Sequence, residues 1–282
     1  MKKTRIILCA ILFGSFAAGL QSCKKDDLSM TNADPATDDA GSSTSRMWAT
    51  GKQLYAAGHT QSGAASLYTL TAPGGGGLVP SLVAGFYNGG VQVTFVTGIA
   101  YYTPTNSIII STHSSSNNAS SLLTYPAGGP YTTPVVVSCA DITDIEYNEY
   151  DGVLYGIELG TNIVSIDPVF GTITLDLAVA PGAGLVVKGL CNYNGLLSFS
   201  VSDNTGTADN FYSYSPGGSP GAALFTTDWG SGNGGMQYCN ALGWVIISAT
   251  DTKKGVNGST YAVSGPAGMA GGPYFFSDLT SD

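Results

Sequence analysis

Four segments of this chain share one pattern, in which an apolar strand, a short turn and a second apolar strand follow one another. They are residues 96 to 112, 142 to 158, 187 to 202 and 234 to 250. One apolar position recurs in all four, at steps of 46, 45 and 46 residues: Ile99, Ile145, Leu190 and Met236. A fixed period of this length indicates a repeat architecture, in which each repeat is one supersecondary unit.

Two further strands are expected after each copy of the pattern. The third strands are predicted at 66 to 72, 121 to 127, 162 to 168, 210 to 216 and 259 to 265, and the fourth strands at 81 to 87, 134 to 139, 172 to 178, 222 to 228 and 274 to 279. Turns rich in Gly and Pro separate the two, as in hairpins. A first unit at 45 to 59 fits with Met47 in the recurring position, so five units of four strands account for residues 45 to 282.

Units of this length with four antiparallel strands are typical of β-propellers. We predict an all-β fold, a five-bladed β-propeller with blades at about 45–87, 88–139, 140–178, 179–228 and 229–282. Six blades are an alternative if residues 81 to 95 hide an irregular blade, because the first step is 52 residues. A β-sandwich is a further alternative.

One unit carries a more specific resemblance. Asp151–Gly156, followed by Ile163–Pro168 and Gly171, resembles the blades of bacterial propellers of the NHL, quinoprotein-like and surface-layer kinds. These families imply a fold and no activity, because propellers host enzymes, binding proteins and scaffolds alike.

The first residues indicate export. Positive charges at Lys2, Lys3 and Arg5 precede an apolar run that ends at Cys23 and is too short to span a bilayer, so residues 1 to 22 are predicted to be a signal peptide. Residues 20 to 23, Leu-Gln-Ser-Cys, resemble the lipobox of bacterial lipoproteins, which implies a lipid on Cys23 and attachment to a membrane. Residues 24 to 27, Lys-Lys-Asp-Asp, are similar to the tract that follows the lipidated cysteine in Bacteroidetes, which implies an outer-membrane lipoprotein displayed on the cell surface; the periplasmic face is the alternative.

Composition restricts the partners. Residues 23 to 44 are poor in large apolar side chains and are expected to form a flexible tether. The whole chain has 10 Lys and Arg against 19 Asp and Glu, a net charge of −9. Nucleic-acid affinity comes largely from Lys and Arg, so nucleic acid is not an expected partner.

Cysteine usage does not indicate a disulfide framework. With Cys23 lipidated, the mature chain has Cys139, Cys191 and Cys239, and three thiols cannot all pair within one chain. Cys191 and Cys239 could form a disulfide, but packing roles for all three are favoured because buried cysteine behaves as a small hydrophobic residue.

A ligand site is expected on the propeller face that carries the loops from strand four to the next strand one and from strand two to strand three. Candidates in the first class are Tyr87, Asn88, Asp141, Trp229 and Asn233, and in the second class His59 and His113. Aromatic rings and side-chain amides suit sugar rings and hydroxyls, whereas the other interpretation is that these aromatics fill space between blades. The two histidines occupy equivalent positions, but no third ligand accompanies them, so no metal and no cofactor are predicted.

Catalysis is not favoured by the motifs. The chain has no Asp or Glu between Asp39 and Asp141, so the first two predicted blades contribute no carboxylate. Asp144 and Glu146 flank Ile145 and could form an acidic pair near the axis, for which Arg46 is the expected charge partner. The nucleophile-elbow, phosphate-loop and zinc signatures are absent from the mature sequence.

These observations predict a non-catalytic, membrane-anchored binding module for a glycan or a surface protein. One alternative is a polysaccharide-active hydrolase or lyase that uses Asp141, Asp144 or Glu146. Another is a structural component of an outer-membrane complex.

Overall fold

The computed structural model describes residues 53–59, 64–71, 78–114, 119–203, 209–227, 234–239, 243–248, 252–256, 263–268 and 275–281. All of these lie in the unit Ala40–Asp282. They form strands and connecting turns, together with one 3₁₀ turn at Thr103–Thr105 in this part of the chain. No helix long and apolar enough to span a membrane occurs among them. The predictions for Cys23, Arg46, Met47, Trp229 and Asn233 lie outside the described residues.

The described strands form five four-stranded antiparallel sheets and one two-stranded hairpin. The first sheet has the order β22 (Phe275–Ser281), β1 (Leu54–His59), β2 (Ala65–Thr71), β3 (Val79–Gly85). The second sheet is β6 (Val96–Tyr102), β7 (Ser107–Ser114), β8 (Ala119–Pro126), β9 (Val135–Cys139). The third sheet is β10 (Ile142–Asn148), β11 (Val153–Glu158), β12 (Asn162–Ile166), β13 (Ile173–Ala178).

The remaining sheets follow the same order along the chain. The fourth sheet is β14 (Val186–Tyr193), β15 (Leu196–Ser202), β16 (Asp209–Tyr214), β17 (Phe225–Thr227). The fifth sheet is β18 (Gly234–Cys239), β19 (Gly243–Ser248), β20 (Thr252–Val256), β21 (Val263–Gly268). The hairpin is formed by β4 (Tyr87–Asn88) and β5 (Val91–Gln92).

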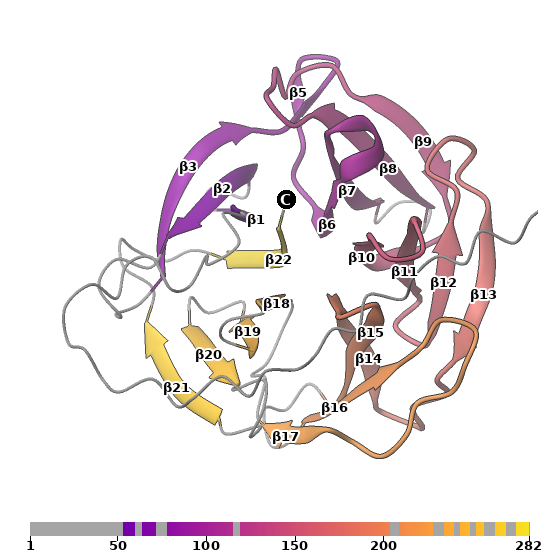
Figure 1. Ribbon diagram of the computed structural model, residues 1–282. Helices are drawn as coiled ribbons and strands as arrows, with labels where there is room; N and C mark the ends of the chain where they lie inside the picture. Colours follow the sequence, from indigo (N-terminus) through magenta and orange to yellow (C-terminus); the bar gives the residue numbers. More distant parts are fainter. Residues whose placement is uncertain are drawn as a thin grey trace, which may run out of the picture. The chain divides into compact units, whose positions relative to one another are not determined.

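The sheets stand around a common axis (Figure 1), each with its first-listed strand innermost. Along the ring, β22 contacts β6, β6 contacts β10, β10 contacts β14, β14 contacts β18, and β18 contacts β22 again. The fold is therefore all-β with a β-propeller arrangement, as predicted.

The last strand corrects the predicted assignment at the end of the chain. Residues 274 to 279 were expected to form the fourth strand of the last unit, but β22 pairs with β1 and is the innermost strand of the first sheet. That innermost position had been assigned to the segment containing Met47. In the fifth sheet, the third and fourth strands are β20 and β21 instead. The two ends of the described chain thus meet in one sheet, which closes the ring without a capping repeat.

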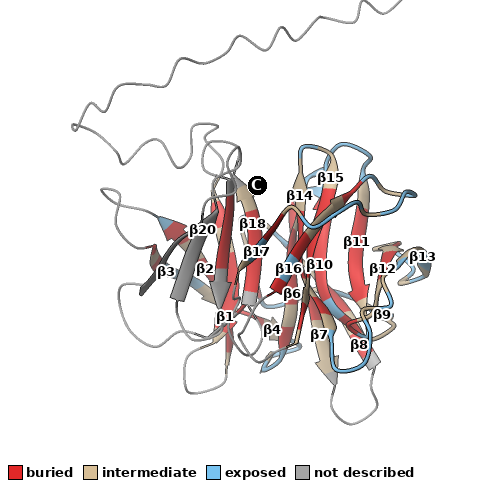
Figure 2. Ribbon diagram, turned by 90° about the horizontal axis from the view of Figure 1, so that it is seen from below, coloured by how far each residue is buried: buried red, intermediate tan, exposed pale blue. Residues whose placement is uncertain are grey.

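The recurring apolar position is confirmed by its burial. Ile99, Ile145, Leu190 and Met236 lie on β6, β10, β14 and β18, and each is fully buried. Leu279 occupies the equivalent place on β22 and is also fully buried. Every innermost strand therefore carries a fully buried apolar residue at this position, and Figure 2 shows buried residues along the strands of the ring.

Each sheet buries both faces, which explains the continuous apolar runs in its strands. On β7, Ile108 and Ile110 pack in the cluster shared with the first sheet, whereas Ile109 packs in the cluster shared with the third sheet. Successive side chains on a strand point to opposite faces, so neighbouring residues contact different sheets. Equivalent clusters join the third sheet to the fourth and the fourth to the fifth.

Candidate functional site

A cavity of about 270 Å³ opens beside the axis between the third and fourth sheets. It is lined by residues from the β9–β10 connection, β10, the β11–β12 turn, β14 and β22: Asp141, Thr143, Asp144, Leu159, Gly160, Val186, Val187, Lys188, Gly189 and Ser277. The connections that reach it run from strand four to strand one and from strand two to strand three. This is the face of the propeller on which the sequence predicted a site.

Bulges in the innermost strands build the wall of this cavity. The pairing of β10 with β11 shifts between Ile142 and Asp144, which leaves Thr143 as an extra residue. The same irregularity leaves Gly189 extra on β14 and Ser277 extra on β22. Because a bulge redirects side chains away from the regular ladder, Thr143 and Ser277 come to line the cavity, and the Thr143 hydroxyl donates to the carbonyl of Ile157 at 3.3 Å.

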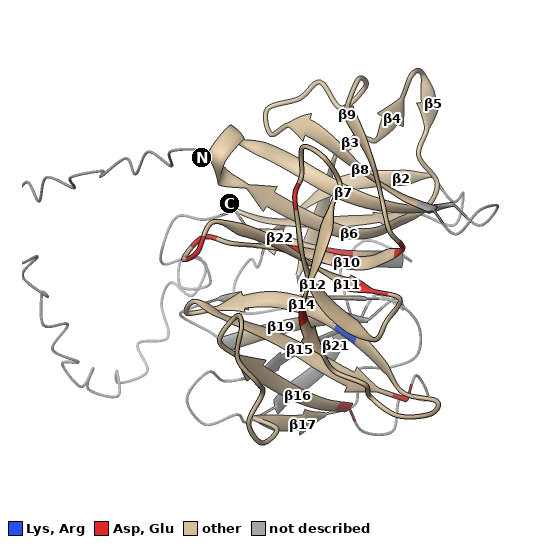
Figure 3. Cartoon of the chain, turned by 90° about the vertical axis from the view of Figure 1, so that its right-hand side faces the viewer, with Lys and Arg blue, Asp and Glu red and all other residues tan. Residues whose placement is uncertain are grey.

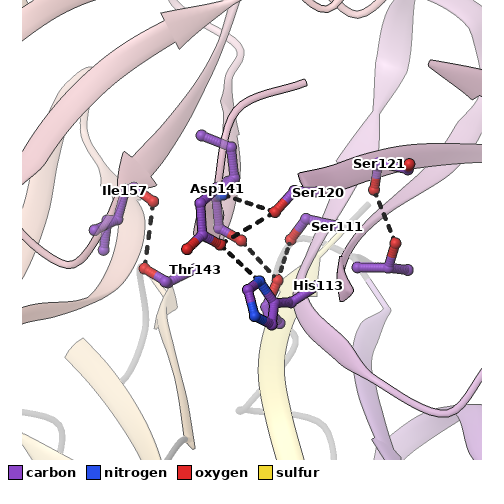
Figure 4. A network of polar contacts seen from close by, with 10 residues as sticks. Ser111, His113, Ser120, Ser121, Asp141, Thr143 and Ile157 are labelled. Atoms are coloured by element: carbon purple, nitrogen blue, oxygen red, sulfur yellow. Dashed lines mark hydrogen bonds and ion pairs between the residues drawn. The ribbon is translucent and has the colours of Figure 1, made fainter. Parts of the chain in front are cut away.

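Asp141 lies at the cavity wall in a small polar network (Figure 4). Its Oδ1 atom is 2.8 Å from Nδ1 of His113 and accepts a 3.3 Å hydrogen bond from the hydroxyl of Ser120. The same hydroxyl accepts the backbone N–H of Ile142 at 3.0 Å. These contacts hold the Asp141 carboxylate in one orientation, at the point where the chain enters the third sheet.

Two aspartates meet at the axis in equivalent positions of the repeat. Asp144 precedes Ile145 on β10, and Asp278 precedes Leu279 on β22. Their side chains are close enough for each to shift the pKa of the other, and they are 3% and 0% exposed. Asp278 is therefore a carboxylate of the first sheet, which corrects the expectation that the first two blades contribute none.

Each aspartate also holds the next sheet in the ring. Oδ2 of Asp144 accepts the backbone N–H of Leu190 at 2.9 Å, and Oδ2 of Asp278 accepts that of Ile99 at 2.8 Å. Glu146 repeats this contact one step along β10, because its Oε1 accepts the N–H of Asn192 at 3.0 Å. The three carboxyl groups thus connect innermost strands of neighbouring sheets.

Burial governs the protonation of these groups. Loss of solvent raises the pKa of Asp144 to about 7, against hydrogen bonds from Asp278 and from the backbone that act in the opposite direction. Burial likewise raises the pKa of Glu146 and that of Asp278 well above their usual values, and the neighbouring Asp144 adds to both effects. The acidic pair predicted at Asp144 and Glu146 therefore lies at the axis, with Asp278 as an additional member.

Glycine occupies the corresponding position on the other innermost strands. A Cβ atom on Gly98 would lie 2.6 Å from the backbone nitrogen of Ile145, and one on Gly235 would lie 2.4 Å from that of Leu279. No real side chain fits at such distances, so these glycines allow neighbouring strands to approach closely. The axis is therefore crowded at these positions.

The predicted loop residues divide into separate groups. His113 and Asp141 are brought together, and Asp141 lines the cavity. Tyr87 and Asn88 form β4, whose partner β5 lies at the outer edge of the ring in Figure 1. The backbone carbonyl of Tyr87 accepts the hydroxyl of Tyr125, and its N–H donates to the carbonyl of Tyr131. His59 ends β1, in the place equivalent to His113 on β7.

Charge is sparse on the described strands, as Figure 3 shows. On the five innermost strands the charged residues are Asp144, Glu146, Lys188 and Asp278. No group of three His, Cys, Asp or Glu residues in the described part of the chain converges as metal ligands would. Cys139 is a free thiol whose pKa is raised by burial to about 11, which makes it a poor nucleophile at neutral pH.

No protein-family model and no curated protein matches this chain. Among solved structures, it is similar to an exo-β-1,3-galactanase from Phanerochaete chrysosporium in complex with β-1,3-galactotriose, with 14% identity and a TM-score of 0.42. The match covers 76% of this chain and 53% of the galactanase, so the chain spans about half the length of that protein. At this degree of likeness, the function has to be inferred from the residues of this chain.

Sequence reasoning missed Thr143, Lys188, Ser277 and Asp278 as residues of the axis and cavity. A signal for Asp278 was present, because Asp278-Leu279 matches Asp144-Ile145 and Leu279 follows Met236 by 43 residues, close to the other steps of the repeat. The hydroxyl residues had no comparable signal, since their direction depends on bulges that the sequence pattern does not reveal.

Proposed function

We propose that this protein is a five-bladed β-propeller that binds a terminal sugar of a glycan in the axial cavity without converting it. The five-blade count is supported by the closed succession of contacts among β22, β6, β10, β14 and β18. Lipidation of Cys23 would anchor the protein to the outer membrane, and residues 23 to 44 would carry the propeller away from the cell surface. The lipobox and the charged tract that follows it support this location.

The lining of the cavity is the observation that carries the proposed ligand class. The polar residues Thr143, Ser277, Asp141 and Lys188 are among those that line this small space. Such groups complement the hydroxyls of a sugar, which donate and accept hydrogen bonds. The volume is slightly below the range of about 300 to 1,000 Å³ typical of small-molecule sites, which favours one sugar unit.

The contacts of the axial carboxyl groups support binding rather than catalysis. Asp144 and Glu146 accept backbone N–H groups of the fourth sheet. A glycoside hydrolase needs one carboxyl group to donate a proton to the substrate and another to act as base or nucleophile. Here the buried carboxyl groups already hold neighbouring strands together.

A glycan-array measurement with the full chain tests this proposal, with Thr143→Val and Thr97→Val as a matched pair. Both residues are bulged threonines on innermost strands, but Thr97 does not line the cavity. We expect Thr143→Val to weaken binding of the recognised glycan at least tenfold and Thr97→Val to leave it unchanged. Equal losses in both variants would contradict a site in this cavity.

The same array tests the predicted role of Trp229. Trp229 lies outside the described residues and precedes β18 in the sequence; if it contacts the sugar, Trp229→Ala weakens binding of the same glycan. Silence across the whole panel, together with co-purification of a membrane protein from detergent extracts, would instead favour a protein ligand or a structural role in an outer-membrane complex.

One observation favours an enzyme as the second candidate. Asp141 and Asp144 both line the cavity, and a pKa of about 7 would keep Asp144 partly protonated at neutral pH, as a general acid requires. Release of reducing ends from the bound glycan, lost in Asp144→Asn and kept in Thr97→Val, would support hydrolysis. Binding without any released sugar supports the module that we propose.

A further inference from the structure

Asp144 and Asp278 meet across a strand that lies between their own. β10 and β22 each contact β6, and at the shared position of the repeat β6 carries Gly98. A glycine there leaves no side chain between the two aspartates. Asp144 and Asp278 are thereby able to bond directly, although they belong to the third and first sheets.

The oxygen atoms of this pair do not balance if both groups are ionised. Each Oδ2 atom accepts a backbone N–H, from Leu190 for Asp144 and from Ile99 for Asp278. Each Oδ1 atom is buried and, as a carboxylate oxygen, has no donor to accept from. Two carboxylates can bond to each other only when one of them carries a proton.

We propose that Asp144 and Asp278 share a proton across the propeller axis, and that this proton fastens the sheet that closes the ring to the third sheet. The first sheet contains both β1 and β22, so its attachment decides whether the ring stays closed. Loss of the last shared proton places two negative charges side by side in a buried site and weakens the closure. This inference concerns the fold and is independent of the proposed ligand.

Among the described innermost strands, the one positively charged residue is Lys188. β6 and β18 carry no charged residue, β10 adds Glu146 to Asp144, and β14 contributes Lys188. Lys188 lines the cavity, as do Asp144 and the acidic Asp141. With no metal-ligand cluster among the described residues, one lysine stands beside three axial carboxyl groups.

The direction of the pH effect follows from the raised pKa values. Burial raises the pKa of Asp144 to about 7 and that of Asp278 well above its usual range, whereas an unfolded Asp titrates near about 3.9. A group whose pKa is raised by folding stabilises the fold fully below its unfolded pKa, and this contribution is lost as the pH rises through the folded pKa. The pair therefore stabilises the ring most in acid, and this stabilisation is lost as the pH rises above about 4 and the two groups ionise.

Urea unfolding of the full chain from pH 5 to pH 9 tests the shared proton, with Asp278→Asn as the critical variant. An asparagine at 278 can accept the N–H of Ile99 and donate to Asp144 through its amide, so it replaces the proton permanently. We expect the unfolding equilibrium constant to rise with pH in both proteins, but less steeply in Asp278→Asn. One titrating proton fewer lowers the rise by a factor of about ten per pH unit.

Asp176→Asn is the matched control. Asp176 also bonds across two sheets, to the hydroxyl of Tyr214 at 2.7 Å and the N–H of Gly217 at 3.1 Å, but it lies on the outer strand β13. Its variant should keep the pH slope of the wild type. Equal slopes in the wild type and in Asp278→Asn would overturn the shared proton.

Two further measurements keep the proposal testable if Asp278→Asn does not fold. In the wild type, ¹³C NMR of the aspartate carboxyl carbons should show two signals that move together in two steps, as coupled groups do. Independent titration of the two aspartates, each near the usual pKa of aspartate, would overturn the shared proton. A fall in the urea midpoint on adding EDTA would instead identify a bound cation as the bridging species, and would equally overturn the proposal.

Discussion

Neighbouring sheets meet at the axis in two different ways, although one position of the repeat serves both. Where β22 meets β6 and where β10 meets β14, an aspartate accepts a backbone N–H of the next strand. Where β6 meets β10 and where β18 meets β22, a glycine lets the next backbone come within direct contact. The first kind of contact depends on a polar partner, and the second depends on the absence of any side chain.

The comparison shows how a repeated backbone can tolerate different residues at its most crowded place. A carboxyl group reaches across a wider separation and satisfies a buried N–H that would otherwise be unpaired. A glycine allows the two strand backbones to come into direct contact, so packing between the strands replaces the polar contact. Substitutions at the two kinds of contact should therefore fail for different reasons and by different amounts.

The largest loss of stability is expected from Gly235→Ala. The added Cβ would lie 2.4 to 2.6 Å from backbone atoms of Asp278 and Leu279, so β18 and β22 must separate. Overpacking of this kind typically costs about 1 to 3 kcal/mol, and we expect about 3 kcal/mol because the contact is with backbone. Urea unfolding measures it, with Gly128→Ala as a control, since a Cβ there meets nothing within 4 Å. Similar losses in both variants would show that the close approach is not the cause.

Asp144→Ala should cost less, at about 2 kcal/mol at neutral pH. The change leaves the buried N–H of Leu190 without its acceptor, and an unsatisfied buried group costs about 1 to 3 kcal/mol. The variant also no longer has to bury a carboxyl group, and this offsets part of the lost stability. Chemical denaturation of both variants ranks the two kinds of contact, and a greater loss for Asp144→Ala than for Gly235→Ala would reverse the comparison.

Thr280→Val isolates a weaker polar contact, between β22 of the first sheet and β6 of the second. Thr280 accepts the N–H of Tyr101 through its hydroxyl at 3.0 Å, and valine has nearly the same shape. We expect a loss of about 1 kcal/mol, the typical net value of one hydrogen bond. A double-mutant cycle with Asp278→Asn would show whether the two contacts between β22 and β6 act together. Strict additivity would mean that they are separate supports.

The smallest effect is expected from Thr97→Val. Its hydroxyl donates to the carbonyl of Ile142 at 2.8 Å and lies 2.9 Å from the hydroxyl of Ser111, in a partly exposed place beside the glycine contact. Water can replace part of what is lost, so we expect about 0.5 kcal/mol. A larger fall in the urea midpoint would mean that the glycine contact between β6 and β10 also depends on polar partners. The distinction between glycine contacts and aspartate contacts would then not hold.

Most of the strand order followed from patterns that act within one unit. The four strands of the second, third and fourth sheets lie close to the predicted ranges, because alternation of apolar residues and Gly- or Pro-rich turns are local signals. The sequence assigned His113 and Asp141 to one face, but their contact was not predicted and is a finding of the structure.

The chain end was misassigned because pairing between distant strands has no local signal. Residues 274 to 279 have a strand pattern that fits either the outermost strand of one sheet or the innermost strand of another. The choice depends on what β22 packs against. In the structure β1, β6 and β18 all contact it, and they come from opposite ends of the sequence.

By itself, the sequence determined the all-β class, the repeat and the buried apolar position in each unit, because these depend on residue type and spacing along the chain. The tertiary structure alone decided that Asp278 comes close to Asp144, that the ring closes through β22, and that bulged residues line a cavity. Those outcomes depend on which distant strands pair and where their ladders slip by one residue, and burial of both faces of every sheet selects one such arrangement from many that fit the sequence pattern equally well.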